Sequence, residues 1–350
     1  MCELVKRFIF ISLILLVTVY QEVKAQRSDK TVTYEELYDD PYDINKLFVH
    51  FQPLYADFWI ANINSGLGLE VQYYWADKFN FRAHARTTYV SKFDLSRDIA
   101  EKNSYDTILA NQPVQYLYYE AGATYHIKDF EEDTETKMVL YRKSYSKGNK
   151  WAATVPLDIN IPSKVRKIYG ARLGGIGYQT TFQIDERFLE AQGITLSPED
   201  TLSASPVISP ETNISAYSNL RSAGFYLGAS YSIIKNFAVK PDRTYGVLTN
   251  DIMFNAFFDF IIMPFTDIEP LEYIVSATES ELYPIDDIQT TFFGFRLGMD
   301  GKFNREFGWG YGAEIGLRPG LAKRGFYASV RVSFPIYGTQ LQHTVEAFGK

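Results

Sequence analysis

Alternation of apolar residues with small or charged ones is the feature that most constrains the fold. In residues 307–318, F-G-W-G-Y-G-A-E-I-G-L-R, an apolar residue occupies every second position, and glycine, Glu314 and Arg318 fill most of the others. A period of two predicts a β-strand, because successive side chains point to opposite faces. Aromatic side chains at this density should not face water. One face of this strand therefore requires apolar surroundings.

The same alternation recurs in six other segments, of which most are close to ten residues long: 67–75, 79–89, 117–127, 224–233, 293–301 and 326–334. The first two are separated by three residues, which predicts a hairpin. A soluble β-sandwich also alternates, but its strands average five or six residues. About ten residues is the length that a tilted strand needs to cross a bilayer. We therefore expect an all-β fold, a transmembrane antiparallel up-and-down β-barrel of about 12 strands, within a range of 10 to 14.

Residues 1–25 have the three-part pattern of a secretory signal peptide. Lys6 and Arg7 precede an apolar run of about a dozen residues, and V-K-A precedes Gln26. We expect cleavage after Ala25, a periplasmic segment over 26–46, the barrel over 47–338 and a periplasmic tail over 339–350. The run is shorter than the roughly 20 residues of a membrane helix.

Composition excludes several classes of protein. Without the leader the chain holds 32 basic and 40 acidic residues and no cysteine, since the single Cys2 lies in the leader. The acidic balance argues against a nucleic-acid partner, and disulfides are excluded. No zinc spacing or phosphate-binding glycine loop is present, so we expect neither metal nor cofactor. The 26 Tyr, 26 Phe and 4 Trp suit the aromatic girdles of a membrane barrel.

Connection lengths support the barrel. The longest connections, 90–113, 183–220 and 264–289, all fall on one side when strands are counted from a periplasmic N-terminus, which is the pattern of long outer loops and short periplasmic turns. Residues 135–182 are poorly patterned, and Gly174-Gly175 indicates a bulge or a turn there. The predicted strands are 48–62, 65–75, 79–89, 114–127, 135–143, 150–158, 166–182, 221–235, 246–263, 290–301, 307–318 and 324–336.

The leader, the tyrosine-rich strands and the closing pair G-Y-G-A-E-I-G-L-R-P-G and G-F-Y-A-S-V-R-V-S-F resemble outer-membrane β-barrel proteins of Bacteroidetes-type bacteria. The resemblance is architectural and covers most of residues 47–338. It implies a location in the bacterial outer membrane, with outer-membrane lipid around the barrel and protein partners in an outer-membrane complex.

Charged residues on the glycine-rich faces should line the lumen. Both signs occur, which argues against the single-sign lining of a strongly ion-selective pore. They either pair to hold a modest barrel closed or form a polar channel or ligand site. The predicted lumen-lining network is Glu70, Arg82, His84, Arg86, Glu120, Arg172, Asp259, Arg296, Asp300, Glu314, Arg318 and Arg331.

Catalytic and metal sites lack their usual sequence patterns. His84 and His126 fall on neighbouring predicted strands about 16 Å apart along the strand direction, too far to share a metal; His50 is ambiguous. An outer-membrane hydrolase needs a nucleophile beside a histidine, and no serine stands out beside His84. We therefore predict no enzyme and no catalytic residue.

Short helices are expected at two places outside the barrel. Residues 33–38, T-Y-E-E-L-Y, resemble the start of a short helix capped by Thr33, and a second helix is expected from Ser96. The N-terminal segment as a whole is expected to be a disordered tail. It could instead fold into the lumen as a plug or bind a periplasmic partner.

Three functions remain in order of preference. The first is a narrow, porin-like channel or transport protein for small solutes. The second is a sealed barrel that serves as an accessory or plug subunit of a larger outer-membrane assembly, such as a secretion translocon. The third is an outer-membrane hydrolase. About 12 strands favour a narrow or closed interior, since wide aqueous channels have 16 to 18.

Overall fold

The computed structural model describes residues 33–103, 111–147, 150–199, 207–211, 216–241, 246–276, 279–304 and 308–339. The expected signal peptide, most of the N-terminal segment and most of the C-terminal tail lie outside these ranges. The chain divides into two compact units, Met1–Thr33 and Tyr34–Lys350, and the second contains every element described below. Among the described helices, none has the length and apolar character needed to cross a membrane.

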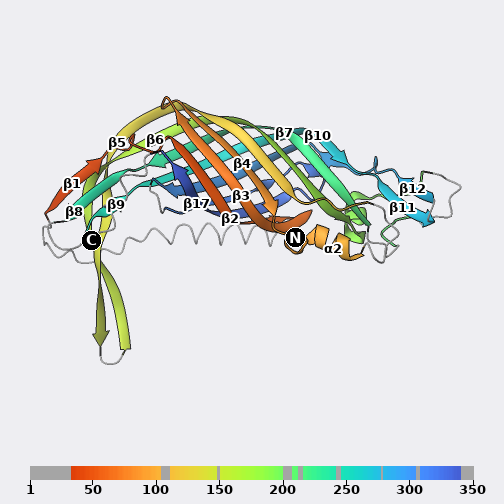
Figure 1. The fold of residues 1–350 in the computed structure, drawn as a ribbon, viewed down its shortest axis with the longest axis horizontal. Helices are drawn as coiled ribbons and strands as arrows, with labels where there is room; N and C mark the ends of the chain where they lie inside the picture. Colours follow the sequence, from red (N-terminus) through yellow and green to blue (C-terminus); the bar gives the residue numbers. More distant parts are fainter. Residues whose placement is uncertain are drawn as a thin grey trace, which may run out of the picture. The chain divides into compact units, whose positions relative to one another are not determined.

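Ten antiparallel strands form a closed barrel in the order of the chain, and the last strand pairs with the first (Figure 1). The expectation of an all-β barrel is confirmed. The barrel strands are β2 (Leu47–Trp59), β3 (Asn62–Trp75), β4 (Phe79–Thr88), β5 (Leu117–Lys147), β6 (Lys150–Ile184), β7 (Ala216–Ile234), β10 (Ile252–Ile268), β14 (Phe293–Phe303), β15 (Gly310–Leu317) and β17 (Phe326–Gly338).

The expected count of 12 strands is wrong. The predicted strands 114–127 and 135–143 are both parts of β5, and 150–158 and 166–182 are both parts of β6. Pairing of β5 with β6 runs from Leu117↔Gln179 to Lys147↔Lys150, with register shifts at His126/Lys128 and Val139/Tyr141. Because each shift reverses which residues share a face, the alternation breaks there and reads as a strand end. Gly174-Gly175 makes no turn and pairs within this ladder.

The excess length of β5 and β6 forms a hairpin that extends beyond the barrel. Pairing of β4 with β5 reaches Tyr125, and β7 pairs with β6 only from Arg166 onward, so 128–147 and 150–165 leave the wall together. Figure 1 shows this hairpin leaving the left end of the barrel. We call that end the hairpin end and the opposite one the loop end.

A small sheet packs against the base of the hairpin. It consists of β1 (Tyr34–Asp39), β8 (Phe237–Pro241) and β9 (Leu248–Asn250). Phe237 and Val239 of β8 cluster with Met138 and Ile161 of the hairpin. The helix expected from Thr33 is therefore wrong: Tyr34–Asp39 pairs with the edge of β8, and this tertiary pairing overrides the local capping pattern.

The described parts of the long connections 89–116, 185–215 and 269–292 lie at the loop end, as the lengths of these connections predict. They carry a 3₁₀ turn η1 (Ser91–Phe93), α2 (Leu95–Asn103), α3 (Glu186–Gln192), the hairpin of β11 (Leu271–Ser276) and β12 (Glu279–Tyr283), and β13 (Thr290–Thr291), which pairs with β16 (Gly320–Leu321). The position of α2 confirms the helix expected from Ser96.

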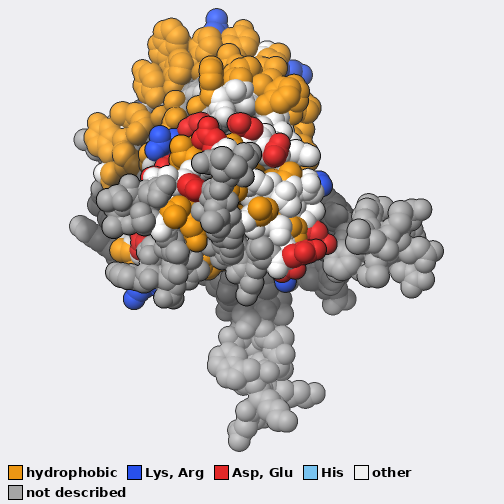
Figure 2. All heavy atoms as spheres, turned by 90° about the vertical axis from the view of Figure 1, so that its right-hand side faces the viewer, with side chains coloured by type: hydrophobic (Ala, Val, Ile, Leu, Met, Phe, Trp, Pro, Cys, Tyr) orange, Lys and Arg blue, Asp and Glu red, His pale blue; other side chains and the backbone are white. Residues whose placement is uncertain are grey.

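The barrel has its apolar side outward. Along β14, Phe293 and Leu297 are 63% and 55% exposed, whereas Arg296 between them is 1% exposed. Figure 2, viewed toward the loop end, shows hydrophobic side chains gathered over one part of the surface, with acidic ones near the centre of the view. A soluble protein places these two classes of side chain the other way round.

Candidate functional site

The barrel interior is the candidate site, and Arg296 lies at its centre. Its guanidinium donates to Glu120 at 2.6 and 2.7 Å and to Asp259 at 2.8 Å. Arg172 donates to the other oxygen of Asp259 at 2.9 Å. Tyr118 donates its hydroxyl to Glu120 at 2.7 Å. Two strands therefore supply the carboxylates and two others the arginines, so the ion pairs join opposite parts of the wall.

A second group of ion pairs lies toward the hairpin end. Arg331 of β17 binds Glu314 at 2.6 Å and also Asp300. Arg82 of β4 reaches Asp300 at 2.5 Å and Glu70 at 3.1 Å. Each of these carboxylates lies within 4.0 Å of more than one arginine, which offsets part of the cost of taking charges out of water.

A third group lies toward the loop end. Arg318 donates to Asp57 at 2.9 Å, and the hydroxyl of Tyr116 donates to the same carboxylate at 2.8 Å. The Arg318 guanidinium also lies 4.2 Å from the centre of the Tyr327 ring. Arg86 donates to Gln52 at 3.2 Å and lies 3.8 Å from Glu314. These contacts link the polar interior to aromatic residues above it.

All twelve residues of the predicted lumen network lie in the interior. Eleven of them belong to one connected set of ion pairs, and Arg318 pairs separately with Asp57. Ten are buried; Arg82 and Asp300 retain a little exposure. The described interior pairs six arginines with six carboxylates once Asp57 is included. The sets are Arg82, Arg86, Arg172, Arg296, Arg318 and Arg331, and Asp57, Glu70, Glu120, Asp259, Asp300 and Glu314.

Asp57 is the functional residue that the sequence pattern missed. In β2, the even-numbered residues are buried up to Gln52, and the odd-numbered residues are buried from Tyr55 onward. The register with β3 shifts between these two residues, where Pro53 lies. Proline cannot donate to a ladder and marks bulges in strands. Pro53 was therefore the signal that could have moved Asp57 to the interior face.

Interior glycines make room for these side chains. A Cβ added to Gly312 would lie 2.5 Å from the guanidinium carbon of Arg331, and one added to Gly228 would collide with the carboxylate of Asp259. Both glycines occupy positions directly beside a charged residue of a neighbouring strand. The glycine-rich strands are thus explained by the volume of the arginines and carboxylates that they face.

An apolar cluster closes the loop end. Tyr55, Trp59 and Tyr178 of the wall pack with Phe188 of α3 and with Leu271 of β11, all within one buried cluster. The ring of Phe188 lies 5.8 Å from that of Phe182. The long connections therefore fold over the barrel as a packed cap.

The hairpin end is closed by the segment that enters β2. Ile44 is fully buried in a cluster with residues of β2, β3, β6, β7 and β10, namely Phe48, Tyr74, Ile168, Ile234 and Met253. Asn236 donates to the carbonyl oxygens of Asp40 and Asp43, and the side chain of Asn304 accepts from Asn45 at 2.9 Å. Residues 40–46 thus occupy the place of the plug that the N-terminal segment could form instead of a disordered tail.

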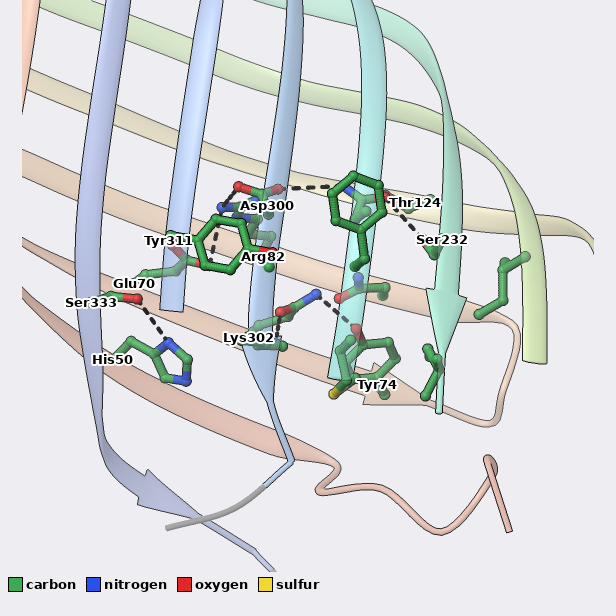
Figure 3. Close-up of a pocket in the computed structure, with 18 of the residues that line it drawn as sticks. His50, Glu70, Tyr74, Arg82, Thr124, Ser232, Asp300, Lys302, Tyr311 and Ser333 are labelled. Atoms are coloured by element: carbon green, nitrogen blue, oxygen red, sulfur yellow. Dashed lines mark hydrogen bonds and ion pairs between the residues drawn. The ribbon is translucent and has the colours of Figure 1, made fainter. Parts of the chain in front are cut away.

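A cavity of about 50 Å³ lies between this plug and the ion pairs. Figure 3 shows His50, Arg82, Asp300, Lys302 and Tyr311 around it. His50 contacts the hydroxyl of Ser333 through Nδ1 at 3.3 Å. Its Nε2 has no hydrogen-bond partner in the described structure. This serine–histidine pair lacks the acidic or amide group that orients a catalytic histidine, and the cavity is too small for a lipid or peptide substrate.

His84 and His126, the other histidines that the structure describes, make structural contacts. His84 stacks on Tyr118 with ring centres 5.4 Å apart and lies 3.5 Å from Glu120. His126 contacts the carbonyl oxygen of Asp77 at 2.9 Å and lies 3.5 Å from Asp129. Within the described ranges, no three histidine, cysteine or acidic residues form a group that could hold a metal.

Two comparisons with known proteins give no match. No protein-family model matches the chain, and no curated protein matches its sequence.

Proposed function

We propose that the chain is an outer-membrane β-barrel with a sealed lumen, which acts as an accessory subunit of a larger membrane assembly. The observation that carries the membrane location is the exposed apolar wall around a charged interior. A barrel leaves no open edge and satisfies its backbone internally, as a bilayer requires. The loop end then faces outward and the hairpin end faces the periplasm.

The filled interior favours the sealed barrel over the narrow channel. Across the described residues, the apolar cap, the ion pairs and the Ile44 cluster follow one another along the barrel. Ion pairs with several partners resist dissociation because each broken pair leaves a buried charge. A solute would have to displace all three layers.

The hairpin supports a docking role. Its strands have unpaired edges beyond the barrel, and unpaired edges recruit further strands unless they are protected. Protein partners that add a strand to such an edge gain main-chain hydrogen bonds. We therefore place the partner surface on residues 128–147 and 150–165.

Planar-bilayer recording tests the sealed lumen. We expect no conductance steps from the wild-type mature chain once insertion is confirmed by protease protection. The paired variant Arg82→Ala/Arg86→Ala, which removes two interior cations, is the comparison. Stable wild-type steps that change in this variant would overturn the sealed barrel and restore the narrow channel.

A shortened hairpin tests docking. Val139 pairs with Asp158, so these residues can be joined by Asn-Gly, which favours a tight hairpin turn. This variant keeps Met138 and Ile161 packed. A photo-crosslinking residue at position 137 should lose its protein adduct in the shortened chain, while one at exposed Lys128 in the base should keep any adduct that it forms. An unchanged adduct at 137 would contradict docking through the hairpin.

A further inference from the structure

Lys302 is the surplus charge of the barrel interior. The six arginines and six interior carboxylates balance one another, and Lys302 of β14 adds a seventh cation. No described carboxylate forms an ion pair with its ammonium group. Among described residues, its contacts are the side-chain oxygen of Gln72, the ring of Phe48 with its centre 3.8 Å away and the ring of Tyr74 at 5.5 Å.

The cavity beside Lys302 has further polar atoms without described partners. Arg82 has no acceptor for its Nε–H, Asn80 Oδ1 has no donor, and His50, 4% exposed, has no partner for Nε2, which donates or accepts according to the tautomer. These residues line the cavity together with Lys302. The carboxylates on the same wall, Glu70 and Asp300, are bound by Arg82 and Arg331. Lys302 is therefore the cation of this lining that no described carboxylate pairs.

Size limits what the cavity can hold. About 10–15 Å³ of such space accommodates one water molecule, so the 50 Å³ of this cavity takes a few waters or one small ion with its hydration. A sugar, nucleotide or fatty acid does not fit. Four members of the Ile44 cluster, Tyr74, Ile168, Ile234 and Met253, line the cavity.

We propose that this cavity binds one small monovalent inorganic anion, of the size of chloride, as the counter-ion of Lys302. A buried charge without a partner costs several kcal/mol after relaxation. An anion accepts hydrogen bonds from the ammonium group and from the nearby ring or guanidinium N–H groups. It would complete the charge balance of the interior as Asp57 does for Arg318.

Bromide locates the site directly. Crystals of the wild-type chain grown in bromide should show an anomalous peak in the cavity beside the Lys302 ammonium group. The peak should be absent in Lys302→Met and present in Lys164→Met, which removes an exposed lysine of the hairpin. Only water density in the wild-type cavity would overturn the proposal.

Stability in solution gives a second measure that needs no crystals. At constant ionic strength, exchange of gluconate for chloride should raise the unfolding midpoint of the wild type by about 4 °C if chloride is at ten times its Kd. Lys302→Met should lose this difference, and Lys302→Arg should keep it. An equal difference in wild type and Lys302→Met would contradict the site. Since these measurements use folded protein in micelles, they do not depend on the proposed docking role.

Discussion

The two faces of β14 differ more in polarity and in contacts than the two faces of a strand in a soluble protein do. Outward, Phe293, Phe295 and Leu297 are exposed; inward, Arg296 and Asp300 join ion pairs with five other strands. Among the described residues, the outward face makes ring contacts along the wall, such as that of Phe295 with Phe258, but stays largely exposed, whereas the inward face is held by ion pairs and hydrogen bonds. The contacts that stabilise this barrel are therefore concentrated inside, whereas the stability of its outer wall depends on the medium that surrounds it.

The largest expected effect comes from the inward face. Arg296→Ala leaves Glu120 and Asp259 without their central cation, and removal of one partner of a buried ion pair costs about 3–5 kcal/mol. Urea unfolding in lipid vesicles measures the loss. Leu297→Ala, one position away on the outward face, is the control. Equal losses in the two variants would remove the distinction between the faces.

A charge on the outward face tests its surroundings. Leu297→Arg should destabilise the barrel in a bilayer by about 2–4 kcal/mol, the cost of arginine on the lipid face near the midplane. Urea titration of vesicle-inserted protein measures this. On a water-facing strand the same exchange would be nearly neutral, and that outcome would show that lipid does not surround the strand.

A smaller loss of stability is expected when the same truncation is made in the plug and in the outer wall. Ile44→Val removes one methylene from a fully buried cluster and should cost about 1 kcal/mol. Ile63→Val removes the same group from an exposed wall position and should cost less, because lipid fills the space. The shifts of the urea unfolding midpoint in Ile44→Val and in Ile63→Val, each relative to wild type, measure the two losses. A greater loss at Ile63 would mean that residue 44 does not seal the hairpin end.

The smallest effect concerns the cap at the loop end. Burial raises the pKa of Asp94, although Asn62 and the backbone N–H of Tyr116 donate to its carboxylate. A raised folded-state pKa stabilises at low pH and loses that contribution as pH rises through it. Amide exchange in residues 89–103 should therefore speed up, beyond the intrinsic change, as pH rises above the ordinary aspartate pKa of 3.8. Asp94→Asn should reduce this excess; an undiminished excess would exclude Asp94 as its source.

Alternation predicts much of this barrel from the sequence, because the exposed apolar wall and the charged interior impose opposite demands on successive residues. The phase of β14 and β15 is read directly from F-G-F-R-L-G-M-D and from Y-G-A-E-I-G-L-R. Arg296, Glu314 and Arg318 were placed inward on that basis.

The features that escaped prediction are those in which the period breaks or contacts are distant in sequence. Bulges in β5 and β6 made two strands look like four, and the bulge at Pro53 hid Asp57. The cap and the Ile44 plug arise from loops without periodicity, and their contacts join residues up to some 260 positions apart. The alternation of β14 alone places Lys302 inward. Only the full set of interior contacts shows that no described carboxylate pairs with it.

The central claim, a lipid-facing wall around a closed interior, is tested most directly by the accessibility of single nitroxide labels. Residues 26–350 contain no cysteine, so in a chain of these residues Leu297→Cys and Lys137→Cys each carry one label. In vesicles, the label at 297 should collide with oxygen and be shielded from a water-soluble nickel chelate, and the label at 137 on the hairpin should show the reverse. Free access of the chelate to position 297 would contradict the account.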